Sequence, residues 1–117
     1  MLPDDARERL LTKRAATLGH RDTLSRTFSD IVDSARDTNI DDEHDPEGST
    51  VAAERSLVAS LGRGATERLA QIDRALARLD DGTYGDCVRC GRPIAQARLV
   101  ALPAAELCVD CARLPRP

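Results

Sequence analysis

The chain has 117 residues, 41% of them hydrophobic, with a net charge of −3, no tryptophan, a single phenylalanine and a single tyrosine. So few aromatic side chains exclude a large globular core, and small chains of this kind are usually stabilised by a metal, a disulfide or a coiled coil. The N-terminal segment lacks the apolar run of a signal peptide, and no stretch of about eighteen apolar residues suggests a membrane span, so we expect a cytoplasmic protein with reduced thiols.

The first third of the chain has the pattern of a long amphipathic helix. Apolar side chains recur in steps of three and four, which places them on one face of a helix; they are Leu24, Phe28, Ile31 and Ala35. A second stripe follows the heptad spacing and consists of Leu11, Leu18 and Val32. We therefore expect a helix from about residue 4 to residue 37.

A polar segment at residues 37–50 interrupts this pattern with a run of carboxylates and no Lys or Arg before Arg55. Asp45 followed by Pro46 predicts a new helix, with Asp as N-cap and Pro at the first helical position. Charge runs of this kind are usually solvated loops. The alternative is an acidic tip that approaches positive charge, such as a bound Mg²⁺. The candidate tip residues are Asp41, Asp42, Asp45 and Glu47.

The second helical segment, from about residue 46 to residue 80, keeps a regular apolar repeat. Its positions are Val58, Leu61, Ala65, Leu69, Ile72, Leu76 and Leu79. This repeat is typical of a coiled-coil seam, and two helices of about 34 residues, each roughly 50 Å long, predict an antiparallel hairpin. A globular helical bundle is the alternative. Gly62 and Gly64 each cost about 1 kcal/mol relative to Ala inside a helix, and either a kink or plain tolerance would explain them.

All four cysteines lie in two C-x-x-C pairs with seventeen residues between them: Cys87 and Cys90, then Cys108 and Cys111. This spacing is typical of a zinc site, because each C-x-x-C turn brings two thiolates to one ion and two turns complete a tetrahedron. Gly91 suits the tight turn after Cys90. We predict one structural Zn²⁺, whose closed shell leaves no catalytic position. A redox motif and a pair of disulfides are the alternatives.

These elements predict a mainly α fold, a long antiparallel helical hairpin (coiled coil) followed by a small four-cysteine zinc-finger module. The expected domains are residues 1–80, a hairpin with its acidic tip at about residues 37–50, and residues 81–117, the zinc-finger module with a short C-terminal tail.

The combination resembles the DksA/TraR family of bacterial transcription regulators. The resemblance covers roughly residues 30–114 and depends on the run G-x-Y-G-x-C-x-x-C-G followed by R-L-x-A-x-P-x-x-x-x-C-x-x-C. The matching residues are Gly82, Tyr84, Gly85, Cys87, Cys90, Gly91, Ile94, Arg98, Leu99, Ala101, Pro103, Cys108 and Cys111.

The resemblance implies a regulator that binds RNA polymerase directly, without contacting DNA. The hairpin enters the secondary channel, the tip lies near the catalytic Mg²⁺, and the zinc module anchors the hairpin outside. Some members act together with the nucleotide ppGpp, so ppGpp is a candidate effector. We expect a monomer without catalytic activity.

Two departures from the family pattern modify this expectation. The best-studied branch carries D-x-x-D-x-A at its tip, whereas here the first Asp is kept as Asp45, the second is replaced by Gly48 and the Ala by Thr50. Glu47 lies one position early, which on a helix means a rotation of about 100°. Polymerase binding is therefore expected to persist while the effect on transcription differs or disappears. Pro115 and Pro117 follow soon after Cys111 and argue against a ppGpp response that needs a C-terminal helix.

Two other classes of function stay open. A DNA-binding zinc finger needs a basic surface, and here only a small one is available in an acidic chain without stacking aromatics; it consists of Arg89, Arg92 and Arg98. The same three arginines are candidate outer contacts to polymerase, or they are simply solvated. A hairpin that serves as a scaffold is the other class. An enzyme is disfavoured because no nucleophile–base pair is evident.

Overall fold

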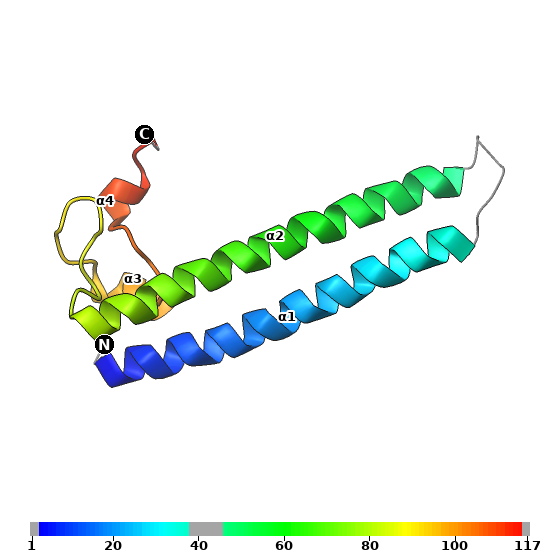
Figure 1. Ribbon diagram of the computed structural model, residues 1–117. Helices are drawn as coiled ribbons and strands as arrows, with labels where there is room; N and C mark the ends of the chain where they lie inside the picture. Colours follow the sequence, from blue (N-terminus) through cyan, green and yellow to red (C-terminus); the bar gives the residue numbers. More distant parts are fainter. Residues whose placement is uncertain (1–2, 38–45, 116–117) are drawn as a thin grey trace. The chain divides into compact units, whose positions relative to one another are not determined.

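The computed structural model describes residues 3–37 and 46–115, with side chains described for 3–35 and 50–115. Its helices are α1 (Pro3–Asp37), α2 (Pro46–Asp81), α3 (Gln96–Ala101) and α4 (Val109–Ala112), as Figure 1 shows. The mainly α fold is confirmed, and both long helices begin and end within one residue of the predicted positions. In the described part of the chain, no helix is long and apolar enough to cross a membrane.

The chain divides into two compact units, one formed by residues 1–16 and 68–117 and the other by residues 17–67. Both divisions fall inside the long helices, so each helix contributes to both units. A domain boundary at residue 80 stays a prediction.

In the first unit the start of α1 runs antiparallel to the end of α2. Arg7 Nη2 lies 2.8 Å from Asp80 Oδ1, and seven residues later Arg14 Nε lies 2.8 Å from Asp73 Oδ1. Between the same parts of the two helices, Leu10 of α1 is buried in a small apolar cluster with residues of α2. The α2 residues of this cluster are Ile72, Ala75, Leu76 and Leu79.

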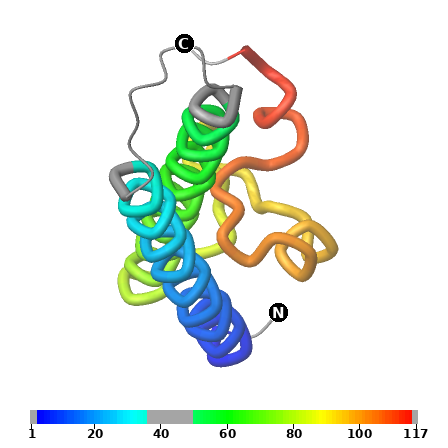
Figure 2. Tube along the Cα trace, turned by 90° about the vertical axis from the view of Figure 1, so that its right-hand side faces the viewer, coloured from blue at the N-terminus to red at the C-terminus, as the bar shows by residue number. Residues whose placement is uncertain are grey.

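The rest of the first unit is the segment that follows α2. Figures 1 and 2 show it, coloured yellow to red, folding back beside the last turns of α2. The segment contains α3, α4 and an isolated antiparallel bridge between Asp86 and Pro93. Its own apolar cluster is centred on the buried residues Cys87, Ile94, Leu99 and Cys111. We call residues 82–114 the finger.

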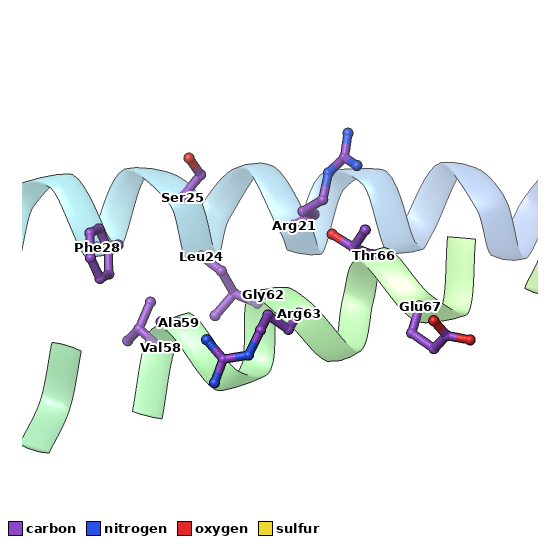
Figure 3. Close-up of a pocket in the computed structure, with 10 residues that line it drawn as sticks. All are labelled: Arg21, Leu24, Ser25, Phe28, Val58, Ala59, Gly62, Arg63, Thr66 and Glu67. Atoms are coloured by element: carbon purple, nitrogen blue, oxygen red, sulfur yellow. The ribbon is translucent and has the colours of Figure 1, made fainter. Parts of the chain in front are cut away.

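In the second unit the two long helices again run antiparallel. Figure 3 shows Phe28 and Val58 at one end of the shared face and Arg21 and Thr66 at the other. The predicted α1 stripe is half-buried, as expected for a helix that packs with one face only; its residues are Leu24, Phe28, Ile31 and Ala35.

Of the predicted α2 seam positions, Leu61 is the one that the structure exposes. Leu61 is 45% exposed, whereas the neighbouring Gly62 lines the space between the helices with Val58. With Gly62 in the seam, the contact positions alternate regularly in steps of four and three through Ala65 to Leu69, as a coiled coil requires. Adjacent residues of a helix are about 100° apart around its axis, so Leu61 points away from the seam that contains Gly62.

A groove of about 500 Å³ lies between α1 and α2, and Gly62 is one of the residues that line it. Figure 3 shows Leu24 of α1 pointing towards α2 next to Gly62. Helix α2 continues through Gly62 and Gly64 without interruption, so the glycines are tolerated in the helix.

Candidate metal centre

The four cysteines converge at one place in the first unit. Their Sγ atoms all lie within 4.8 Å of one another, and those of Cys90 and Cys108 are 3.8 Å apart. Four thiolates around one zinc ion at about 2.3 Å require separations of this size. All four are free cysteines rather than disulfides. The donor set is also the one that soft thiolate sites offer to zinc. The residues therefore fit a zinc centre with four cysteine ligands.

A tight turn presents the first pair of cysteines. Cys87 N–H donates to Arg92 O at 2.8 Å, and Gly91 N–H donates to Cys87 O at 2.9 Å. Gly91 has a φ of +76°, the left-handed conformation that a residue without Cβ adopts without strain. The expectation that Gly91 permits this turn is confirmed.

The second pair lies at the start of α4. Cys108 is the N-cap, and its sulfur accepts a hydrogen bond from Cys111 N–H at 3.5 Å. Ala112 N–H donates to Cys108 O at 2.9 Å, which closes the first helical turn. One turn of helix thus brings Cys108 and Cys111 to the same side of the chain.

The surroundings of the buried thiols move their pKa values in opposite directions. Burial alone would raise the pKa of Cys87, but backbone N–H groups of Cys108, Cys90 and Arg89 outweigh it and lower that pKa to about 6. Burial and the neighbouring thiols raise the pKa of Cys111 to about 12. Only a thiolate is a good zinc ligand, so zinc binding displaces the proton of any cysteine thiol that is still protonated.

The other residues of the family motif build the support of the metal centre. Tyr84 packs against both apolar clusters of the first unit, and its hydroxyl donates to the carbonyl of the buried Pro103 at 2.9 Å. Burial raises the pKa of Tyr84. Gly82, with a φ of +81°, ends α2 by letting Thr83 N–H return to Arg78 O at 2.9 Å. These residues hold the finger on α2.

The candidate contact arginines are placed differently from one another. Arg92 is exposed, and so is Arg89, whose Nη1 lies 3.5 Å from Pro115 O. Arg98 is half-buried and donates from Nε to Leu107 O at 2.8 Å, a bond within the finger. The predicted tip residues lie outside the residues whose side chains the structure describes; they are Asp41, Asp42, Asp45 and Glu47.

The sequence pattern did not identify Glu106 as a residue of this centre. Its carboxylate accepts hydrogen bonds from Arg74 and Arg78 of α2, and its main-chain oxygen accepts one from Val88 N–H. The sequence feature that could have pointed to Glu106 is its position two residues before the zinc-ligand candidate Cys108.

Comparison with known proteins places these observations in a family. Residues 82–114 match the model of the prokaryotic dksA/traR C4-type zinc finger. The chain is 33% identical over 96 residues to the RNA polymerase-binding transcription factor DksA of Escherichia coli (strain K12), covering 80% of this chain and 60% of that protein. It is 30% identical over 104 residues to the protein of the same name from Caulobacter vibrioides, covering 89% of this chain and 63% of the relative.

The fold has a counterpart among solved structures. Transcription factor DksA2 from Pseudomonas aeruginosa superposes with a TM-score of 0.77 at 25% sequence identity, covering 94% of this chain and 79% of that chain. The similarity therefore includes the long helices as well as the finger. The chain spans 60–63% of the length of the two DksA proteins.

Proposed function

We propose that this chain is a member of the DksA/TraR family of bacterial zinc-finger proteins and that it regulates transcription by binding RNA polymerase directly. The observation that carries the proposal is the similarity to the E. coli RNA polymerase-binding transcription factor DksA. It extends over 96 residues, whereas the finger occupies residues 82–114, so the long helices share in the similarity.

In this proposal the hairpin of α1 and α2 enters the secondary channel of the polymerase, and the acidic segment around Asp45 acts near the catalytic Mg²⁺. The family resemblance supports this placement. The exposed Arg89 and Arg92 are the candidate contacts outside the channel. The protein works in the cytoplasm as a monomer and without contacting DNA itself. A response to ppGpp is left to direct measurement.

One zinc ion has a structural part in this proposal. When bound, it would hold the two C-x-x-C turns together through Cys87, Cys90, Cys108 and Cys111. The sulfur separations support four protein ligands, which fill a tetrahedral shell and leave no position for a substrate. The regulator accordingly has no catalytic activity of its own.

A binding experiment separates this proposal from the alternatives. Fluorescently labelled, zinc-loaded chain is titrated with core RNA polymerase and, separately, with duplex DNA at several salt concentrations, and its mass is followed by sedimentation. We expect saturable binding to polymerase by a monomer and none to DNA. Salt-sensitive binding to DNA would instead support a DNA-binding finger. A stable dimer that binds neither would support a scaffold.

A further inference from the structure

Glu106 connects three parts of the first unit. Its Oε1 accepts hydrogen bonds from Arg74 Nε at 2.5 Å and from Arg78 Nη1 at 3.5 Å, both on α2. Its main-chain oxygen accepts Val88 N–H at 2.9 Å, and Val88 lies within the first C-x-x-C turn. The chain then reaches the second C-x-x-C turn two residues later. A single residue therefore touches α2 and the structures that present both pairs of cysteines.

The Glu106–Arg78 ion pair is better protected from water than the pairs that join α1 to α2, whereas Arg74, the nearer partner of Glu106, is 49% exposed. The side chains of Glu106 and Arg78 are 24% and 12% exposed, whereas those of Asp80 and Arg7 are 69% and 42% exposed. Exposed pairs contribute little, but the loss of one partner from a shielded pair leaves the other charge without compensation. Loss of the Glu106 carboxylate should therefore affect the first unit more than loss of the Asp80 carboxylate.

The charge of the Arg78 guanidinium is compensated by Glu106, although the distance between Arg78 Nη1 and Glu106 Oε1 is as long as 3.5 Å. Its Nη2 is buried and has no hydrogen-bond partner among the described residues, so Glu106 is the carboxylate that compensates this guanidinium. The main-chain oxygen of Arg78 also accepts hydrogen bonds from Thr83 N–H and Tyr84 N–H, the second and third residues after α2. The end of α2 is therefore connected to the finger through both the side chain and the backbone of Arg78.

We propose that Glu106 is a positioning residue that couples zinc occupancy of the finger to the order of the last turns of α2. Zinc fixes the two C-x-x-C turns, these fix the backbone of Glu106, and the carboxylate then holds Arg74 and Arg78. Coupling between two equilibria is reciprocal, so the contact with α2 must also raise the affinity for zinc. The Glu106 contacts thereby link the metal centre to the helix that continues into the second unit.

The test compares the full-length chain with Glu106→Gln, which keeps the size of the side chain and removes its charge. Zinc affinity is measured by competition with a chelator, and hydrogen exchange of residues 72–81 is followed with and without zinc. We expect zinc to protect these residues in the wild type and to protect them much less in Glu106→Gln. The zinc dissociation constant should rise by about tenfold, as for other groups that orient metal ligands.

Asp80→Asn is the matched control, because it removes a carboxylate–arginine pair near the end of α2 that holds α1 instead of the finger. It should leave zinc affinity unchanged. If Glu106→Gln does not fold, Arg78→Gln removes the better shielded of the two arginine partners of Glu106 and should give the same two changes. An unchanged zinc affinity in Glu106→Gln, or an equal loss in Asp80→Asn, would overturn the proposal.

Discussion

Gly82 and Gly62 differ in backbone conformation, and this difference determines what a side chain would do at each position. Gly82 has a φ of +81°, in the left-handed region that side chains disfavour, and ends α2 there. Gly62 lies inside α2, and a Cβ built on it meets nothing within 4 Å. The first glycine is required by its conformation, whereas the second occupies a helical position that another residue would fill.

Alanine at these two positions should therefore change stability in opposite directions. Gly62→Ala should stabilise the zinc-loaded chain by about 1 kcal/mol, the difference in helix propensity. Gly82→Ala should destabilise it by about 1–2 kcal/mol, the cost of a left-handed residue with a Cβ. Thermal unfolding of both variants beside the wild type measures the signs. The same sign for both would show that the local backbone does not determine their effects.

Some of the side chains at the metal centre and in the helix contact could be predicted from the sequence, and others could not. The zinc ligands were identifiable because C-x-x-C spacing fixes sulfur geometry locally. Glu106 was not, because its partners Arg74 and Arg78 lie about thirty residues away and no periodicity marks such a contact. Leu61 was placed in the seam in preference to Gly62 because a residue without a side chain gives no hydrophobic signal.

At the scale of elements, the long helices were predictable from their ends and their periodicity. The Asp45–Pro46 pair marked the start of α2, and the structure begins that helix at Pro46. The finger was predictable as a metal module but not in its internal contacts. Arg98, for example, was a candidate outer contact, and the structure shows it bonded to Leu107 O within the finger.

Zinc removal should affect these elements unequally. Binding energy at a structural zinc site is folding energy, so strong chelation should unfold the finger. Most helical signal should remain, because α1 and α2 have 35 and 36 residues whereas α3 and α4 have 6 and 4. Circular dichroism and hydrogen exchange of the chelated chain measure both effects.

The zinc content of each sample is checked by metal analysis, and zinc added back serves as the control for reversibility. Unchanged circular dichroism and thermal stability after verified zinc loss would contradict a structural zinc.

At the scale of the whole molecule, the family similarity and the proposed function rest on different observations. The finger matches the model of the dksA/traR C4-type zinc finger, and 80% of the chain is similar to the E. coli protein DksA. In the proposed function the effect on transcription depends on the tip, where Asp45 is kept while Gly48 and Thr50 depart from the pattern of the best-studied branch. Glu47 lies one position early in the sequence, which on a helix is a rotation of about 100°, so we predict that the effect of this tip on transcription differs from that of the best-studied branch or is lost.

The most direct test of the account combines polymerase binding with a transcription assay on the same samples. Zinc-loaded wild type and Asp45→Ala are each added to core RNA polymerase for binding, and to the holoenzyme on a promoter with an unstable open complex for transcript yield. We predict that both proteins bind, that the wild type changes transcript yield, and that Asp45→Ala loses this effect. A wild type that binds without any effect would contradict the assignment of the tip as effector, and a wild type that does not bind polymerase would contradict the proposed function itself.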